Sequence, residues 1–196
     1  MAEAREAALP AAVGAVTPRE RRVPSERALV RAAQRGSAPA MEELFRLHWP
    51  RAHRAAWLVV HDAAAAEDVA QEAFLAAVRA LERFDRRRPF GPWLHRIVVN
   101  RAIDYARARD VRREVPADVV AEAAGADTRD APSGELLGAL ALLAPEQRAV
   151  IVLRHLLGYT PGEIAAILEL PRGTVNSRLR RGLDALADPL REEARR

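Results

Sequence analysis

Residue types that can recognise DNA bases cluster near the C-terminal end of the sequence, between Pro171 and Arg181. This segment contains four arginines and no acidic residue. Arginine and asparagine can form paired hydrogen bonds with base edges, while serine and further arginines can hold phosphates. If the segment and the residues after it are helical, Val175, Leu179, Leu183 and Leu186 share an apolar stripe and the polar residues lie opposite it. The segment therefore predicts a DNA-binding helix face; the alternative is a solvated face in an arginine-rich protein.

The residues before this segment predict the turn that would present such a helix to DNA. Residues 160–163 are T-P-G-E, which places a hydroxyl at the N-cap, proline at the first helical position and glutamate three residues after the cap. The helix that begins there can continue only to about Leu168, because Pro171 forces a turn. A short helix, a tight turn and a longer helix form a helix-turn-helix, which favours DNA binding over the solvated face.

A second basic element lies in the first half of the chain. Residues 86–113 contain nine arginines and two aspartates, a net charge of +7. Trp93 and Tyr105 lie among these arginines, and aromatic rings beside arginines can stack unpaired bases while the arginines follow the backbone. Because Trp93 shares a helical stripe with Ile97, a place in the core is the favoured interpretation for Trp93. For the arginines, nucleic-acid binding is favoured.

Helical patterns account for the rest of the ordered sequence. Capping residues and apolar spacing predict helices at residues 25–34, 37–60, 63–83, 91–109, 135–143 and 145–157. Pro50 is expected to interrupt the second of these helices, whose apolar stripe includes Leu44, Leu47, Trp57 and Leu58. No strand-like alternation is present, so the predicted fold class is all-α.

Composition divides the chain into two small helical domains. Residues 1–24 have three prolines and no sustained periodicity, which predicts a disordered extension. Alanine, glycine, proline and acidic residues predict a flexible acidic linker over 114–133. The expected domains are then a helical bundle at 25–113 and a helix-turn-helix domain at 134–190.

The overall composition excludes several kinds of protein. All 31 basic residues are arginine, and the chain has no cysteine, hence no disulfide or thiolate metal site. No run approaches the roughly 18 apolar residues of a membrane-spanning helix, and no secretory signal is apparent. The expected location is the cytoplasm.

A catalytic site would have to be formed by His48, His53, His61 and Asp62, since histidine and aspartate can bind a catalytic metal. No glutamate or histidine recurs at a tight ligand spacing, and Asp62 has a sufficient role as a helix cap. His95 and His155 are interpreted as incidental residues of helix faces. We therefore expect no catalytic residue, no metal and no cofactor.

Several long motifs, in this order, resemble those of the extracytoplasmic-function (ECF) sigma factors, a class of the sigma-70 family. The first motif, AEDVAQEAFL at residues 66–75, resembles the segment with which the family grips the clamp helices of bacterial RNA polymerase. The resemblance implies that polymerase is contacted by Glu67, Asp68, Gln71, Glu72 and Phe74. Acidic and amide side chains on one exposed ridge could meet a basic helix pair.

The second motif, RPFGPWLHRIVVNRAIDYARAR at residues 88–109, resembles the family's element that melts and recognises the promoter's −10 element. Asn100 and the loop 85–89 are the implied holders of a base flipped out of the duplex, which would offset the cost of unstacking. The implied −10 residues are Arg86, Arg87, Arg88, Trp93, Asn100, Arg101, Asp104 and Arg107.

The third motif, with LAPEQRAVIVLRH and PRGTVNSRLRR, resembles the family's second domain over residues 143–186. It implies contact with the polymerase flap and recognition of the −35 element by Arg172, Thr174, Asn176, Ser177, Arg178, Arg180 and Arg181. Two positions depart from the family pattern. Glu169 stands where the turn often has glycine, which would cost about 1 kcal/mol if that position needs a positive φ. Asn176 is often basic.

The resemblance implies a sigma factor that directs promoter recognition, DNA melting and transcription initiation in a stress or envelope response. Its expected partners are core RNA polymerase, promoter DNA and an anti-sigma factor, because family members are often held inactive by such a protein. The alternative is a transcriptional regulator that binds duplex DNA through its helix-turn-helix without polymerase. That alternative leaves the acidic ridge and the basic segment of the first domain unexplained.

Overall fold

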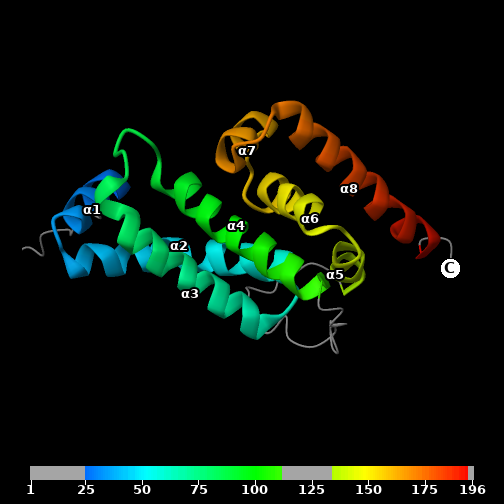
Figure 1. The fold of residues 1–196 in the computed structure, drawn as a ribbon, viewed down its shortest axis with the longest axis horizontal. Coiled ribbons are helices and arrows are strands. Elements are labelled where there is room, and N and C mark those ends of the chain that lie inside the picture. The colour runs from blue at the N-terminus through cyan, green and yellow to red at the C-terminus, as the bar shows by residue number, and fades with distance from the viewer. Residues whose placement is uncertain (1–24, 112–133, 194–196) are drawn as a thin grey trace, which may run out of the picture.

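The computed structural model describes residues 25–111 and 134–193, and the elements within those ranges are helical (Figure 1). The first group is α1 (Glu26–Gln34), α2 (Ala38–Val60), α3 (Ala63–Ala80), a 3-10 turn (Leu81–Arg83) and α4 (Phe90–Val111). The second is α5 (Gly134–Ala141), α6 (Pro145–Ile151), a π-helical turn (Val152–Leu156), α7 (Pro161–Leu168) and α8 (Arg172–Glu193). The all-α prediction is confirmed. The predicted extension 1–24 and linker 114–133 lie outside the described residues.

Alanine-rich contacts hold α2, α3 and α4 together. The side chains of Ala55, Ala66 and Ala73 have no exposed area, and Leu94 and Val98 fill the space between them. Small residues let helix axes approach closely, so dispersion contacts are dense although aromatic residues are few. Helices α1, α2 and α3 begin where their caps were predicted: the side chains of Ser25, Ser37 and Asp62 all accept a hydrogen bond from the first turn.

The break predicted at Pro50 is wrong, because α2 continues through it from Ala38 to Val60. Proline deprives the Arg46 carbonyl of its helical partner. Both Arg46 and Pro50 are exposed, so water can satisfy that carbonyl, while packing against α3 and α4 holds the helix on either side. The predicted apolar stripe is also partly wrong, since Leu47 is 54% exposed.

One arginine organises the junction between the two groups of helices. Arg148 of α6 is 4% exposed. Its guanidinium donates to the carbonyls of Leu140 at 2.9 Å, Ala141 at 3.1 Å and Leu143 at 2.8 Å, and also to the carbonyl of Val59 at the end of α2. The first three carbonyls belong to the end of α5 and the turn after it. One side chain therefore closes α5 and joins it to α2.

The second group of helices packs directly on the first. Helix α4 lies between α2 and α3 on one side and α6 and α7 on the other (Figure 1). Within the second group, Gly182 of α8 faces Ile151 of α6 closely, and a Cβ at that glycine would lie 2.6 Å from the end of the isoleucine side chain. No helix in the described ranges is both long enough and apolar enough to span a bilayer.

Candidate nucleic-acid interface

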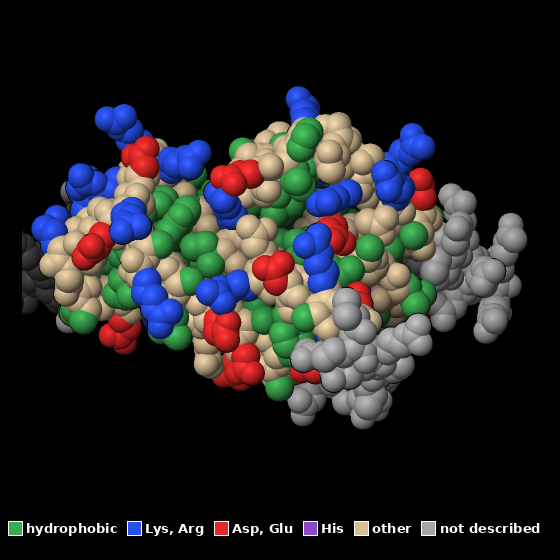
Figure 2. Space-filling model, viewed as in Figure 1, with side chains coloured by type: hydrophobic (Ala, Val, Ile, Leu, Met, Phe, Trp, Pro, Cys, Tyr) green, Lys and Arg blue, Asp and Glu red, His purple; other side chains and the backbone are tan. Residues whose placement is uncertain are grey.

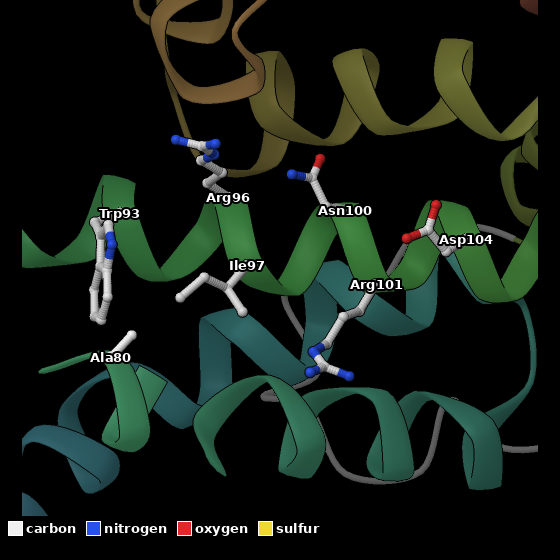
Figure 3. A pocket seen from close by; sticks show the side chains of 7 residues that line it. All are labelled: Ala80, Trp93, Arg96, Ile97, Asn100, Arg101 and Asp104. Carbon is white, nitrogen blue, oxygen red and sulfur yellow. The ribbon is translucent and has the colours of Figure 1, made fainter. Parts of the chain in front are cut away.

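An open cleft runs along the exposed side of α4 (Figure 3). Its volume is about 620 Å³, and it is lined by Ala80, Trp93, Arg96, Ile97, Asn100, Arg101 and Asp104. The cleft brings together four of the predicted −10 residues, Trp93, Asn100, Arg101 and Asp104. An amide, two guanidiniums, a carboxylate and an aromatic ring at one wall can bind both the edge and the face of a base.

Trp93 contributes to the cleft and to the core at once. Its ring centroid lies 4.6 Å from that of Phe84 and 5.4 Å from that of Phe90, and both phenylalanines are buried. The indole is half-buried and points toward Ala80, while Asn100, about two helical turns further along α4, is exposed (Figure 3). The predicted core position of Trp93 is therefore confirmed, and one edge of its ring still reaches the cleft.

The arginines of α4 are paired with carboxylates from other helices. Arg101 donates to Glu72 of α3 at 2.7 Å, and Arg107 donates to Glu146 of α6 at 2.6 Å. Arg96, which the sequence did not single out, lies 2.5 Å from Glu169 in the turn before α8. The sequence gives no sign of these pairs, because their members are 29 or more residues apart along the chain.

The loop between α3 and α4 presents the remaining predicted −10 arginines, Arg86, Arg87 and Arg88, all exposed. Asp85 orders this loop, since its carboxylate accepts from the backbone N–H of Arg87 at 3.0 Å. The backbone N–H of Phe90 donates to Glu26 of α1 at 3.1 Å, which fixes the start of α4. The loop thus has a defined shape with its guanidiniums free to reach outward.

The predicted polymerase-binding ridge lies on α3, but one of its five predicted residues is buried. Glu67, Asp68, Gln71 and Glu72 are exposed, and Gln71 donates to Glu67 at 3.0 Å. Phe74 is 7% exposed and packs against Phe45 and Trp49, at centroid distances of 4.7 Å and 5.7 Å. The apolar side chains that reach the surface beside the acids are instead Leu75 and Val78, which are 55% and 44% exposed.

The structure divides the predicted −35 residues of α8 among three environments. Arg172, Asn176 and Arg180 are exposed at intervals of four and share one outward face. Arg181 is exposed beside them. Ser177 donates its hydroxyl to the backbone carbonyl of Thr174 at 2.9 Å, so this side chain is bonded within its own helix. Arg178 lies toward α6, where its charge helps lower the pKa of Glu146.

The start of α7 and the turn that follows this helix have the predicted geometry. Thr160 and Glu163 form the complete capping box, with the carboxylate accepting from the Thr160 backbone at 2.8 Å. These bonds lower the pKa of Glu163. Glu169 has φ 54°, so the positive φ considered from the sequence is real. The ion pair with Arg96 and the packing of the turn offset that strain.

An apolar groove with a volume of about 470 Å³ lies where α2, α5, α6, the π-helical turn and α8 meet. It crosses the junction of the two groups of helices. Its walls are made by Arg54, Leu58, Leu136, Leu140, Ile151, Val152, His155, Leu156, Leu183, Leu186 and Ala187. Leu183, predicted to be on the packed stripe of α8, is 44% exposed here. The groove has the character of a site for an apolar helix of a partner.

Two of the four residues considered for a metal have structural partners. His48 lies 3.1 Å from Glu26, and Asp62 accepts from the N–H of Ala65 at 2.9 Å as the cap of α3. In the described part of the chain, no group of three or more histidines, aspartates or glutamates is placed to hold a metal ion.

The interpretation of His95 as an incidental residue is wrong. His95 is 4% exposed, and its Nδ1 shares a hydrogen bond of 2.7 Å with the hydroxyl of Tyr159. Burial lowers the pKa of His95 to about 4 and raises the pKa of Tyr159 to about 12. Burial, with help from Arg148, also lowers the pKa of His61 to about 3. Both imidazoles are therefore neutral in the folded protein.

Acidification is expected to destabilise the protein before its carboxylates titrate. Unfolding releases His61 and His95 to bind protons near pH 6.5, so their contribution to stability is complete above that pH and is lost as the pH falls toward 4. Below about pH 6, each histidine should change the free energy of unfolding by up to about 1.4 kcal/mol per pH unit. Urea unfolding between pH 7.5 and 5.0 would measure it. In His95→Gln the free energy of unfolding should fall less steeply with decreasing pH than in wild type. His155→Gln changes an exposed histidine and should keep the wild-type pH dependence. An equal pH dependence in the two variants would contradict the assignment to His95.

Comparison with known proteins gives consistent matches in both groups of helices. The family model described as Sigma-70 region 2 matches residues 44–112, and that described as Sigma-70, region 4 matches residues 133–186. The chain is 34% identical to the ECF RNA polymerase sigma factor SigM of Mycobacterium tuberculosis, with 83% of each chain covered. It is also 34% identical to the RNA polymerase sigma-H factor of Pseudomonas aeruginosa, covering 85% of this chain and 95% of that one.

Two solved structures share the arrangement of helices. CnrH in complex with the cytosolic domain of CnrY has a TM-score of 0.66 at 30% identity, covering 85% of this chain and 97% of CnrH. The sigma factor RpoE in complex with the anti-sigma factor NepR from Bartonella quintana has a TM-score of 0.65 at 25% identity, covering 76% and 96%. Both are sequence and fold matches over most of their own length.

Proposed function

Since this chain belongs to the ECF sigma factors of the sigma-70 family and is an RNA polymerase sigma factor, we propose which of its surfaces bind promoter DNA and which bind core polymerase. Members of this family are initiation factors that catalyse no reaction. This chain acts in the same way in the cytoplasm, and it catalyses no reaction and uses no cofactor of its own. The observation that carries the proposal is the α4 cleft, where Asn100 and Trp93 share one opening with guanidiniums.

The α4 cleft is the site for the melted −10 element. Asn100 can bind the edge of an extruded base, and the accessible part of the Trp93 ring can stack on its face. Arg101, in the cleft, and Arg107, exposed further along α4, can hold the backbone. Asp104 lies between these arginines and can accept from a base amino group. Arg86, Arg87 and Arg88 extend the same positive surface. Capture of an extruded base offsets the few kcal/mol of unstacking, so binding itself can keep the duplex open.

The outward face of α8 is the site for the −35 element. Arg172, Asn176 and Arg180 have the spacing to enter a major groove together, and the exposed Arg181 beside them can reach a phosphate. Thr174 and Ser177 support the helix start through their shared hydrogen bond and set the register of that face. Asn176 favours adenine over guanine, because an amide pairs with the adenine edge.

Core polymerase meets two surfaces of this chain. The ridge of Glu67, Asp68, Gln71 and Glu72, with Leu75 and Val78 beside it, can bind basic helices with an apolar centre. The apolar groove on α5, α6 and α8 suits the helix of the polymerase flap. An anti-sigma factor that competes for either surface would silence the protein.

Run-off transcription tests the function directly. Purified bacterial core polymerase would be assayed with and without this protein on a pool of promoter fragments from its own genome. We expect specific initiation only when the protein is present, and the start sites would give the promoter motif. Tight binding to duplex DNA without any binding to polymerase would instead support the polymerase-independent regulator.

Asn100→Ala is expected to impair promoter opening more than promoter binding. The change removes the amide that holds the extruded base but leaves the −35 face intact, so opening should fall by about 10-fold or more, on the scale of one lost base contact. Permanganate reactivity of the −10 element would measure opening, and retardation of the closed complex would measure binding. Asn176→Ala is the matched control and should lower binding instead. Equal loss of both steps in Asn100→Ala would count against the base pocket.

A further inference from the structure

A row of arginines runs along α1, outside the −10, −35 and polymerase surfaces. Arg27 and Arg31 lie on the helix and Arg35 is its C-terminal cap, and all three are exposed. They recur at intervals of four residues and lie opposite the face that α1 buries against the bundle. At 1.5 Å per residue, this arginine row is about 12 Å long. It is therefore a single outward strip of three positive charges.

The outward face of α1, all of whose residues the structure describes, carries no acidic side chain. The acid of this helix, Glu26, is half-buried; it accepts from the backbone N–H of Phe90 at 3.1 Å and lies 3.1 Å from the His48 imidazole. No carboxylate of the described residues forms an ion pair with the arginine row, whereas the exposed Arg46 and Arg107 each have one. Like charges four residues apart repel one another, and an anionic partner relieves that repulsion.

Hydrogen bonds fix the arginine row next to the basic loop between α3 and α4. At one end of α1, the side-chain amide of Gln34 donates to the carbonyls of Leu81 at 2.8 Å and Phe84 at 3.0 Å. At the other end, Glu26 accepts from the first residue of α4. Helix α1 thus holds both ends of the loop 85–89, which carries three exposed arginines of its own. Figure 2 shows basic side chains grouped at this end of the molecule.

The position of α1 in the bundle decides which part of the promoter can reach it. Helix α4 begins at Phe90, next to α1, and ends at Val111, where the chain leaves the bundle toward the second domain. Because the second domain is proposed to bind the −35 element, a strand that runs along the α4 cleft toward α1 leads away from that element. It is therefore the downstream strand. It is also single-stranded there, since the cleft is proposed to hold the melted −10 element.

We propose that the arginine row of α1 binds the backbone phosphates of the single-stranded DNA just downstream of the −10 element. This inference rests on the proposed role of the α4 cleft. It adds a contact that the family match does not include, because the match to Sigma-70 region 2 begins at residue 44, after α1. Guanidiniums bind phosphate oxygens through paired, charge-assisted hydrogen bonds. Such contacts recognise no base, so the row opposes re-pairing of the strands at any promoter sequence.

Phosphate binding by the arginine row has a measurable signature in its dependence on salt. Each arginine that neutralises a phosphate releases a condensed counterion, so the affinity falls more steeply as salt is added. Three such contacts on a single strand change the slope of log affinity against log salt concentration by about 2. Between about 50 and 200 mM salt, that slope corresponds to a loss of affinity of about 20-fold. A base-specific contact would leave this slope nearly unchanged.

The test uses holoenzyme assembled from core polymerase and the full-length protein, with two fluorescent single strands whose affinities are measured by anisotropy. The −10 oligonucleotide carries the −10 sequence mapped by run-off transcription, and the long strand continues for about six promoter nucleotides beyond its 3′ end. In Arg27→Gln/Arg31→Gln/Arg35→Gln, affinity for the long strand should fall about 10-fold near 0.1 M salt, and its salt slope should fall by about 2. The −10 oligonucleotide should be bound as tightly as by wild type.

A matched variant controls for net charge. Arg46→Gln/Arg51→Gln/Arg154→Gln removes three charges from exposed positions outside the arginine row and should bind both strands as wild type does. Glutamine has nearly the helix propensity of arginine, so the thermal midpoints of both triple variants should stay close to that of wild type.

Three results would overturn the proposal. The first is wild-type affinity of the row variant for the long strand. The second is an equal loss on both strands, and the third is a loss of core-polymerase affinity in place of DNA affinity. Failure of the proposed function would look different, because wild-type holoenzyme would then fail to bind the −10 oligonucleotide itself, and this inference would fall with it.

Discussion

Arg148→Met is expected to lower the free energy of unfolding by about 3–5 kcal/mol, a loss typical of removing one partner from a buried polar cluster. The change leaves the carbonyls of Leu140, Ala141, Leu143 and Val59 without their donor inside the protein. Methionine fills much of the space, so the loss reflects the missing hydrogen bonds more than a cavity. Urea unfolding followed by circular dichroism at pH 7.5 would measure it.

The size of this effect follows from what surrounds the guanidinium. Burial lowers the pKa of Arg148 to about 10, yet the side chain remains charged at neutral pH. The ends of α5 and α2 supply carbonyl oxygens that carry the negative end of each helix dipole, and these replace a carboxylate partner. Arg154→Met is the matched control on the next helical turn. Arg154 is exposed and donates only to the Tyr159 carbonyl at 3.2 Å, so its loss should cost less than about 1 kcal/mol. Equal losses of the free energy of unfolding in the two variants would show that the hydrogen bonds of Arg148 to these carbonyls add no more stability than the single bond of Arg154.

Arg148 also shows where inference from the sequence ended. Its partners are backbone carbonyls, which leave no mark on residue type, and the chain has 31 basic residues that are all arginine. The capping box at Thr160 and the caps at Ser25 and Asp62 could be predicted because both partners lie within four residues. Long-range polar contacts such as that of His95 with Tyr159 have no such local pattern.

Errors on the helix faces have a related cause. A helical stripe specifies which residues share a face but not how wide the packed part of that face is. Leu47 and Leu183 fall at the edges of their stripes and are exposed, whereas Phe74 was assigned to the polymerase surface and is buried beneath Phe45. The α4 cleft could be anticipated in its residues, because the basic segment and Asn100 are contiguous in sequence. The carboxylates that pair with its arginines could not, since they come from α3, α6 and the turn before α8.

Asp68→Arg/Leu75→Ser is expected to reduce binding to core polymerase by about 100-fold or more while leaving the fold intact. Both residues are exposed on the ridge of α3. The first change places a positive charge against the basic helices proposed to bind there, and like-charge contacts at an interface cost several kcal/mol. The second removes an apolar side chain that is 55% exposed in the free protein and would be covered in the complex. Anisotropy of the labelled variant titrated with core polymerase would give the affinity, and the thermal midpoint would report the fold.

Two comparisons make this result specific to the ridge. Glu82→Arg reverses a charge that is exposed in the 3-10 turn after α3, so it should change polymerase binding far less. Glu72→Gln removes an acid that also pairs with Arg101 of the α4 cleft at 2.7 Å. It should weaken polymerase binding modestly and leave Arg101 free for the DNA backbone, so a Glu72→Gln protein should bind the −10 oligonucleotide more tightly than Glu82→Gln does. Full polymerase affinity in Asp68→Arg/Leu75→Ser would move the polymerase contact away from α3. Loss of affinity without a change in thermal midpoint would place that contact on the ridge, next to the α4 cleft proposed to hold the melted −10 element.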